Sequence, residues 1–292
     1  MTSVRPAAVA GTWYPASGLA LAAAVDRHLA ATTADVAGEL VALIAPHAGL
    51  MYSGPVAAHA YRLLHARTFD AAVLVGPSHF IAFDGVAVSR SAGFQTPLGT
   101  APVAADLADA LMAETPIIRE HAVAHAREHS LEMQLPFLQH LVPAIPIVPL
   151  VMGHQTRATV NALAGALASV LRGRRALLVA STDLSHYHDA TTAARLDAVV
   201  LDCVGQFDAD GLQHALDRQP DHACGGGPTV AVMRAARALG ARDAIVLDYG
   251  DSGDVSGDKS KVVGYMAAAL GNFSRPEGLH YVRRGDRSST GL

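Results

Sequence analysis

The chain has few cysteines, few charged residues and no long apolar runs. Two cysteines in 292 residues are too few for a disulfide framework, which favours a reducing, cytoplasmic location. Charged residues make up 16% and the net charge is −4, so a basic surface for nucleic acid is not expected. Apolar runs stay short of the roughly 18 residues that a membrane span needs, and residues 1–6 lack the apolar core of a secretory signal. We therefore expect a cytoplasmic protein without nucleic-acid or membrane partners.

The chain is rich in hydrophobic residues, which make up 51% of it and can fill a large core. Strand and helix patterns alternate, which predicts a single α/β domain over residues 1–272. Its central sheet is expected to be mostly parallel or mixed and flanked by helices, with a flexible polar tail over residues 273–292. Strands are predicted at 40–46, 72–78, 85–89, 145–151, 176–181, 243–247 and 261–268, and helices at 18–31, 55–64, 103–114, 128–141, 160–171, 193–207, 211–216 and 229–239.

Two histidines directly follow predicted buried strands. His47 comes after the apolar run 40–46, and His79 comes after the run 72–78, with a helical pattern between them. Strand, helix and strand in this order form a βαβ unit, whose strands run parallel and adjacent or nearly so. Both imidazoles would then lie at the carboxyl edge of one sheet, where open α/β proteins build ligand sites. Two neutral imidazoles at one point are a common start of a transition-metal site.

A third strand end repeats this pattern. The predicted strand 176–181 is followed by Asp183 and His186, which would share one helical face if a helical turn began there. A carboxylate beside an imidazole orients it and raises its basicity, which suits a general base. Asp183 has the alternative role of capping the next helix.

Cys224 supplies a third soft donor. It opens the run Cys224-Gly225-Gly226-Gly227-Pro228, which leads into a predicted helix. A thiol near a helix N-terminus has a lowered pKa and is a better metal ligand or nucleophile. The alternative is a buried structural cysteine beside a glycine turn, the role that we expect for Cys203. The glycine cluster matches neither a phosphate-binding loop nor a dinucleotide fingerprint.

His129 and Glu132 are spaced three residues apart in the predicted helix 128–141. This spacing would place both side chains on one helical face. The pair is common in proteins and by itself indicates no particular chemistry.

Together these segments resemble the Memo family (mediator of cell motility), known in bacteria as AmmeMemoRadiSam system protein B. The resemblance covers residues 4–271 in the family's order. Its motifs are Arg5-Pro6, Gly11-Thr12-Trp13-Tyr14-Pro15, Ala45-Pro46-His47-Ala48-Gly49, Tyr52-Ser53-Gly54, Gly76-Pro77-Ser78-His79, Glu128-His129-Ser130-Leu131-Glu132-Met133, Leu135-Pro136, Ser181-Thr182-Asp183-Leu184-Ser185-His186 and Cys224-Gly225.

The resemblance implies a fold similar to that of class III extradiol dioxygenases, which bind Fe(II) through two histidines and a glutamate. In Memo-like proteins a cysteine replaces the glutamate, so the implied metal ligands are His47, His79 and Cys224. His186 falls where the dioxygenases keep an acid/base histidine, and Asp183 and His129 line the same pocket. The chain departs from the family in its triple glycine, which follows the cysteine and would reshape the pocket floor.

The implied cysteine ligand limits how far the dioxygenase activity carries over. A thiolate shifts metal preference toward Cu(I) or Zn while still accepting Fe(II), and it is oxidisable, which argues against ring cleavage. The leading hypothesis is a protein that binds iron or copper and has a redox activity on a small, unidentified substrate. The alternative is a non-catalytic protein whose pocket binds a peptide or partner, and a true extradiol dioxygenase is a third reading. The family name implies a link to a radical-SAM protein, although this chain has no Cys-x3-Cys-x2-Cys motif of its own.

Overall fold

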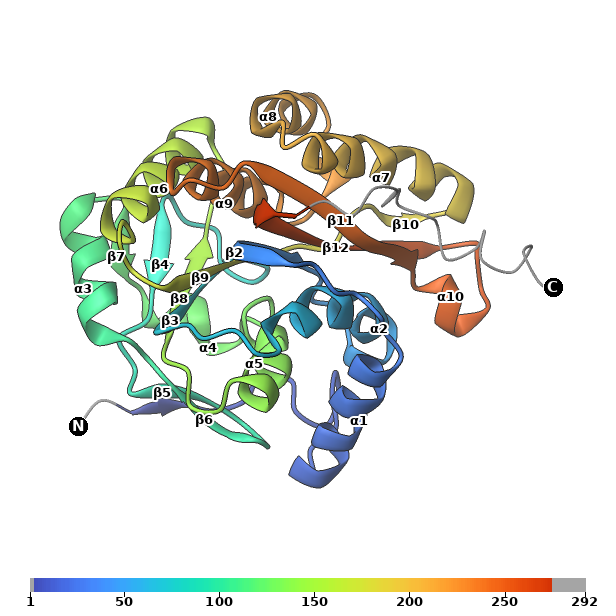
Figure 1. The fold of residues 1–292 in the computed structure, drawn as a ribbon, viewed down its shortest axis with the longest axis horizontal. Coiled ribbons are helices and arrows are strands. Elements are labelled where there is room, and N and C mark those ends of the chain that lie inside the picture. The colour runs from blue at the N-terminus through green and yellow to red at the C-terminus, as the bar shows by residue number, and fades with distance from the viewer. Residues whose placement is uncertain (1–2, 275–292) are drawn as a thin grey trace.

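The structure, a computed structural model, describes residues 3–274 and is built around one mixed sheet (Figure 1). The strands of this sheet are β2 (Gly38–Ala45), β3 (Ala71–Pro77), β4 (Val86–Val88), β7 (Ile118–Glu120), β8 (Ile147–Met152), β9 (Ala176–Ser181), β10 (His186–His188), β11 (Asp243–Asp251) and β12 (Val262–Phe273). Their order is β10-β12-β2-β9-β3-β8-β4-β7, and β11 pairs with β12. Strands β2, β9, β3 and β8 are parallel, whereas β12 runs antiparallel to β2, and β4 runs antiparallel to β8 and parallel to β7. The predicted α/β class with a mixed central sheet is confirmed.

Helices cover both faces of the sheet, because its central strands are apolar on both sides. In β3, Val73 and Val75 belong to one buried cluster and Ala72 and Leu74 to the other. Burying one such valine or leucine stabilises the fold by about 1.5–3 kcal/mol. The helices and 3-10 turns are α1 (Gly18–Ala30), α2 (Leu50–Tyr61), η1 (Arg62–Leu64), α3 (Ala105–Glu114), α4 (Ala122–Ala126), η2 (Glu132–Gln134), α5 (Leu135–Leu141), α6 (Arg157–Val170), α7 (Ala190–Gly205), α8 (Ala209–Arg218), η3 (Pro220–His222), α9 (Gly226–Ala238) and α10 (Gly253–Ser256).

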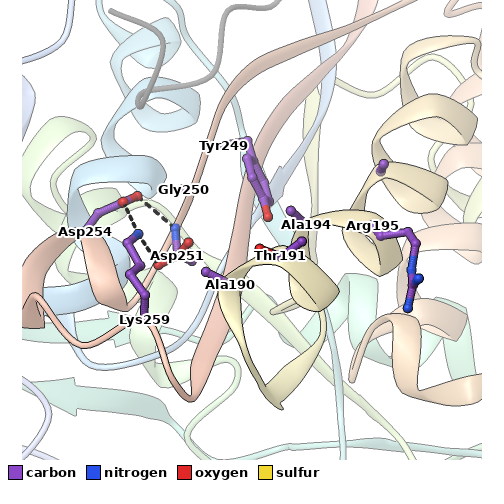
Figure 2. A pocket seen from close by; sticks show the side chains of 10 residues that line it. Ala190, Thr191, Ala194, Arg195, Tyr249, Gly250, Asp251, Asp254 and Lys259 are labelled. Carbon is purple, nitrogen blue, oxygen red and sulfur yellow. Dashed lines mark hydrogen bonds and ion pairs between the residues drawn. The ribbon is translucent and has the colours of Figure 1, made fainter. Parts of the chain in front are cut away.

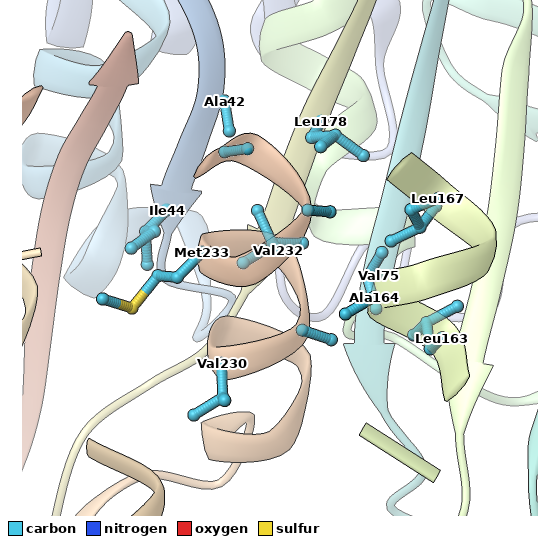
Figure 3. Close-up of a cluster of buried hydrophobic side chains, with 14 of the residues drawn as sticks. Ala42, Ile44, Val75, Leu163, Ala164, Leu167, Leu178, Val230, Val232 and Met233 are labelled. Carbon is cyan, nitrogen blue, oxygen red and sulfur yellow. The ribbon is translucent and has the colours of Figure 1, made fainter. Parts of the chain in front are cut away.

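The helix α9 is the central helix of one face. Figure 3 shows its Val232 and Met233 between β2, β9 and the neighbouring helix α6. Helices α3, α6, α7 and α8 contribute to the same cluster, while α1, α2 and α5 pack on the opposite face. This packing fixes where α9 begins, and therefore where the cysteine that precedes it lies.

The strands that precede His47 and His79 are not direct neighbours. Strand β9 lies between them, with Ala45 of β2 paired to Ser181 and Val75 of β3 paired to Ala180. All three strands are parallel, so their carboxyl ends open on the same edge of the sheet. The topology thus brings the residues that follow β2, β3 and β9 to one place.

The predicted helix 128–141 is wrong in its first part. The chain instead forms α4, an irregular turn through residues 127–131, η2 and a shorter α5. The Glu128 carboxylate accepts the backbone N–H groups of His129 and Ser130, each at 2.9 Å, and bonds to His79, so this turn is tied to the loop that follows β3. His129 and Glu132 consequently do not share a helical face.

Three other predicted segments differ from the structure. Residues 91–100, which lie between the predicted strand 85–89 and the predicted helix 103–114, contain the hairpin β5 (Gly93–Thr96) and β6 (Gly99–Pro102), which pairs with β1 (Val4–Arg5) in a second small sheet. The acidic segment 248–254, which follows the predicted strand 243–247, continues β11 to Asp251 and enters α10. Strand β12 includes Phe273, where the tail was predicted to begin, and residues 275–292 of that tail lie outside the described residues.

Glu132 ties the N-terminal segment to the body of the protein. Its buried carboxylate pairs with Arg5 Nη1 at 2.5 Å, accepts the Tyr14 hydroxyl at 2.6 Å, and accepts the backbone N–H groups of Ala8 and Val9. Burial and the neighbouring carboxylate raise the pKa of Tyr14 well above its usual value. Because this segment includes residue 13, the network also sets the position of a tryptophan at the site described below. No helix within residues 3–274 is long and apolar enough to cross a membrane.

Candidate metal centre

The structure brings together His47, His79 and Cys224 at the carboxyl edge of the sheet. One donor atom from each lies within 4.8 Å of the others, and Cys224 Sγ lies 3.3 Å from His47 Nε2. The His47 ring is buried, while the His79 side chain is 27% exposed. The three residues were expected to converge, and they do; their role as ligands stays a prediction.

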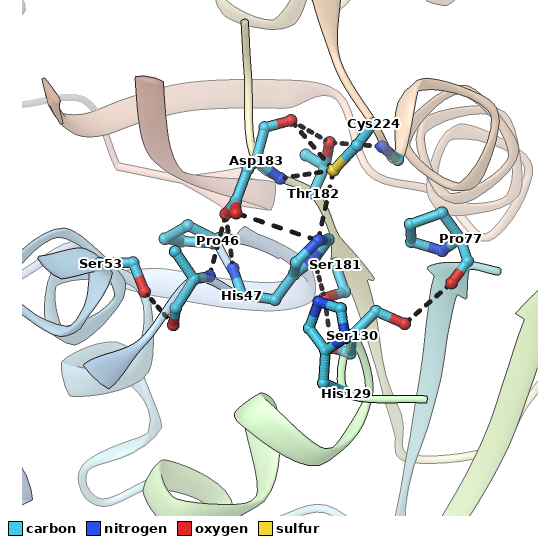
Figure 4. Close-up of polar contacts among 12 residues, drawn as sticks. Pro46, His47, Ser53, Pro77, His129, Ser130, Ser181, Thr182, Asp183 and Cys224 are labelled. Carbon is cyan, nitrogen blue, oxygen red and sulfur yellow. Dashed lines mark hydrogen bonds and ion pairs between the residues drawn. The ribbon is translucent and has the colours of Figure 1, made fainter. Parts of the chain in front are cut away.

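Hydrogen bonds determine which nitrogen of His47 carries the proton (Figure 4). The Ser181 hydroxyl donates to Ser130 O at 2.6 Å and accepts from Gln134 Nε2 at 2.7 Å. Tyr61 donates to the Gln134 oxygen at 2.7 Å, which fixes the orientation of that amide. Ser181 can therefore only accept from His47 Nδ1, 2.9 Å away. The proton is on Nδ1, and the Nε2 lone pair faces Cys224. Burial lowers the pKa of His47 well below its usual value, so the ring is neutral.

His79 is oriented in the same way by Glu128. Glu128 Oε1 lies 2.8 Å from His79 Nδ1, and Oε2 accepts the His79 backbone N–H at 2.7 Å. Burial opposes ionisation of Glu128, but the hydrogen bonds that it accepts from the His79 ring, the His79 backbone N–H and the Ser130 N–H lower its pKa to about 2. Glu128 is therefore a carboxylate that accepts the Nδ1 proton, and His79 Nε2 is left as a donor atom. A carboxylate behind a histidine is a common arrangement at metal sites.

The loop after β9 holds Cys224. Its N–H donates to Asp183 O at 3.2 Å, and its sulfur accepts the Asp183 N–H at 3.3 Å. Burial and the negative charge of Asp183 raise the pKa of the Cys224 thiol well above its usual value. The lowered pKa expected from the helix N-terminus is therefore wrong for the metal-free protein, because burial outweighs the helix effect. A bound cation would reverse this balance in favour of the thiolate.

The three glycines after Cys224 allow close packing on every side of the loop. A Cβ at Gly225 would lie 2.3 Å from Ser181 O, and one at Gly227 would lie 2.8 Å from the Gln155 side chain. The middle glycine packs against α8 in the same way. The triple glycine therefore lets the cysteine approach the strand ends, and it explains the departure seen in the sequence.

Asp183 and His186 are not paired in the way that the sequence predicted. Asp183 accepts the backbone N–H of His47 at 2.7 Å, and His186 begins β10 instead of a helical turn. Asp183 does not cap the next helix either, because the N-cap of α7 is Asp189. Burial raises the pKa of Asp183 to about 6. His186 Nδ1 donates to Leu184 O at 2.8 Å, so its Nε2 carries the lone pair.

The ring of His129 lies beside the rings of His47 and His79. Its ring lies 4.4 Å from that of His79, 5.6 Å from that of His47 and 4.2 Å from that of Trp13. Burial and the neighbouring histidines lower the pKa of His129 to about 3. A neutral ring here shields the centre from water. His129 also groups with His79 and Glu128, but the Nδ1 and Oε1 atoms of those two residues already bond to each other.

Sequence analysis assigned no site role to Trp13, Glu128, Gln134 or Ser181. Trp13, Glu128 and Ser181 lie inside the motifs that resemble the Memo family, which is the signal that could have found them. Cys203 lies on α7 and packs against the core, as expected.

A hollow lies away from the three residues, on another part of the described surface. A cavity of about 550 Å³ opens between the start of α7 and the end of β11 (Figure 2). The Lys259 ammonium contacts Asp251 at 2.7 Å and Asp254 at 2.5 Å. The single positive charge of the lysine offsets one of the two carboxylate charges, and its ammonium lies between the two side chains.

Comparisons with known proteins find similarity along nearly the whole chain. The family model for Memo-like proteins matches residues 5–269. A MEMO1 family protein of Methanothermobacter thermautotrophicus is 38% identical over 275 residues, covering 90% of this chain and 98% of the relative. A MEMO1 family protein of Methanosarcina mazei is 40% identical over 232 residues, covering 78% and 85%. The crystal structure of an uncharacterized protein from Escherichia coli K12 matches with a TM-score of 0.51 at 19% identity, covering 80% of this chain and all of the other, and supports the fold alone.

Proposed function

Because the chain belongs to the Memo family, we propose that it binds one iron or copper ion through His47, His79 and Cys224. One observation carries the proposal. The Nδ1 atoms of both histidines are engaged by Ser181 and Glu128, so both Nε2 lone pairs are available beside the cysteine sulfur. This arrangement is what a three-coordinate protein site with an open face requires.

The residues fit such an ion chemically. Two imidazoles and one thiolate suit Fe(II), copper and zinc better than hard cations such as magnesium. Buried histidines near a divalent ion must be neutral, and burial keeps His47 so. The ionised Glu128 strengthens His79 as a donor and partly balances the charge of the ion.

We further propose that the centre carries out a redox reaction on a small substrate, for which the ion would supply electron transfer. His186 would accept or return a proton at Nε2, because its Nδ1 proton is held by Leu184 O. Asp183 Oδ2, 4.0 Å from His47 Nε2, would orient a polar group of the substrate. His129 and Trp13 would keep water away from one side. The cytoplasmic location predicted from the cysteine content belongs to the same proposal.

One observation favours the alternative, in which the pocket binds a peptide or protein without turnover. Exposed apolar side chains stand next to the site histidines in the chain: Phe80 follows His79 and is 47% exposed, and Tyr187 follows His186 and is 72% exposed. Exposed aromatic residues are typical anchors for protein partners. A radical-SAM protein is the partner class that the family name indicates.

Anaerobic metal loading tests the proposal. Protein purified without a His-tag is supplied with Fe(II) or Cu(I), and bound metal is measured by elemental analysis for the parent, Cys224→Ser and Cys203→Ser. We expect one equivalent in the parent and in Cys203→Ser, and a large loss in Cys224→Ser. Equal metal content in the two variants would refute the assignment of Cys224. Oxygen consumption by the loaded protein then separates a redox function from the binding-only alternative.

A further inference from the structure

The side chain of Gln155 bridges two backbone groups on either side of the Cys224 loop. Its Nε2 donates to Cys224 O at 2.7 Å, and its Oε1 accepts the N–H of Gly227 at 2.6 Å. Gln155 lies in the connection between β8 and α6 and is exposed. These hydrogen bonds reach the loop through its main chain, and neither involves a candidate donor atom.

This bridge replaces a cap that α9 lacks. The N-cap residue of α9 is Gly225, which has no side chain to accept a first-turn N–H group. Gln155 supplies the acceptor from another element. The close approach depends on glycine, because a Cβ at Gly227 would lie 2.8 Å from Gln155 Cβ and 2.9 Å from Oε1. The start of α9 therefore needs a glycine at this position to leave room for the Gln155 side chain.

Hydrogen bonds hold Cys224 at both its backbone N–H and its carbonyl oxygen. The Cys224 N–H donates to Asp183 O, and the Asp183 N–H donates to the Cys224 sulfur. The Gln155 amide donates to the Cys224 carbonyl oxygen. The strand before Gln155 is tied to the His79 side of the site, since β8 pairs with β3 and Ser78 N donates to Met152 O at 2.9 Å. Gln155 thus connects the loop that carries the sulfur to the strand pair that carries His79.

We propose that Gln155 is a positioning residue of the metal centre, which holds the Cys224 sulfur at the distance where it meets His47 and His79. This inference rests on the proposed function. Loss of the amide would free the carbonyl of Cys224 and the first turn of α9, and the sulfur would sample positions away from the imidazoles. The fold would lose little stability, because the bond to the Cys224 carbonyl is exposed and the bond to the Gly227 N–H is only partly buried, so that water can replace much of what is lost.

Cobalt(II) is the probe for the test, because its thiolate charge-transfer and d–d absorption report sulfur ligation directly. We expect Gln155→Ala to raise the Kd for Co(II) about 10-fold or more, to weaken the charge-transfer band, and to leave the Tm of the metal-free protein nearly unchanged. Gln155→Glu keeps the acceptor for the Gly227 N–H but places a carboxylate against the Cys224 carbonyl oxygen. The Kd for Co(II) should therefore rise at least as much in this variant as in Gln155→Ala. Gln139→Ala is the matched control, because Gln139 also bridges two groups, Thr96 Oγ1 and Gly99 O, in another part of the protein.

A second measurement needs no metal. In the Cys203→Ser background, iodoacetamide should label Cys224 several-fold faster when Gln155 is alanine, because the loop is released. Unchanged Co(II) affinity and unchanged labelling in Gln155→Ala, as in Gln139→Ala, would overturn the inference. Cys224→Ser separates the two claims: if it binds Co(II) as tightly as the parent, the metal centre itself fails, while labelling still decides whether Gln155 holds the cysteine.

Discussion

Replacing Ser181 by alanine tests the hydrogen bonds that orient His47. The hydroxyl is the acceptor for His47 Nδ1–H and for the Gln134 amide, and it donates to Ser130 O. In the alanine variant the Nδ1 proton has no acceptor at that position. His47 can then move its proton to Nε2, where it faces the sulfur of Cys224 3.3 Å away. A protonated Nε2 cannot bind a metal ion.

Two magnitudes follow from these contacts. Removing an outer partner of a ligand histidine typically costs 10–100-fold in metal affinity, or about 1.4–2.7 kcal/mol. His47 is only 1% exposed, and its Nδ1 atom would lose its hydrogen-bond partner whichever nitrogen carries the proton, so the metal-free protein should lose about 1–3 kcal/mol of unfolding free energy. Affinity and stability should thus both fall in Ser181→Ala.

The matched control is Ser89→Ala. Ser89 is also buried and its hydroxyl is hydrogen-bonded, to Ser91, but it is not bonded to a site residue. Metal affinity is measured by competition with a chromophoric chelator, and stability by urea unfolding of the metal-free protein. The control should lose stability alone. A folded Ser181→Ala variant with a metal Kd within about twofold of the parent would show that the Ser181 hydrogen bond does not control the His47 tautomer.

Three further predictions concern other residues of the site and its support. Glu128 has a pKa of about 2, below its unfolded value of 4.5, so the carboxylate stabilises the fold by roughly 3 kcal/mol above pH 4.5, and this contribution is lost as the pH falls toward 2. In Glu128→Gln, the unfolding free energy measured with urea should therefore fall less between pH 4.5 and pH 2 than in the parent. An unchanged fall would contradict the role given to Glu128. Glu132→Ala leaves Arg5 buried without its carboxylate and should lower the unfolding free energy by about 3–5 kcal/mol. Arg175→Ala, which removes the exposed ion pair with Asp70, should lower it by less than about 1 kcal/mol. Equal urea midpoints for the two variants would argue against a stabilising buried pair. His186→Ala should keep its metal, by elemental analysis, and lose any turnover, and a folded but metal-free variant would make His186 a ligand.

Those parts of the site whose geometry depends on local sequence patterns could be predicted from the sequence. An apolar run of strand length followed by a histidine places His47 and His79 at strand ends, and parallel strands end on one edge. The glycine run after Cys224 indicated a tight approach of the backbone. Each of these inferences depends on residues that are close in the chain, and the structure brings the three side chains together.

The partners of these side chains were beyond sequence reasoning because they come from remote segments. Ser181 and Glu128 lie 134 and 49 residues from the histidines that they orient. The apolar spacing after residue 128 correctly indicated a helix, but only from Leu135 onward, and residues 127–131 form a turn in which Glu128 bonds to His79 and to its own chain neighbours. A periodic pattern does not reveal such a contact with a remote segment. Nor does it reveal which strand enters between two others.

The insertion of β9 between β2 and β3 has a kinetic consequence for any bound ion. Both histidines are carried by strands in the middle of the sheet, whose buried hydrogen bonds open only when most of the domain unfolds. Cys224 is carried by a glycine loop at the start of a helix, which is held by hydrogen bonds to Asp183 and Gln155 and should open at a lower free energy than the central strands. A metal ion bound here would therefore be hemilabile: the two histidines would dissociate from it slowly and the cysteine would dissociate quickly. Amide hydrogen exchange should be slowest in β2, β9 and β3 and faster around Cys224, and the release of metal should follow the opening rate of that loop, because the sulfur is the first donor to let go.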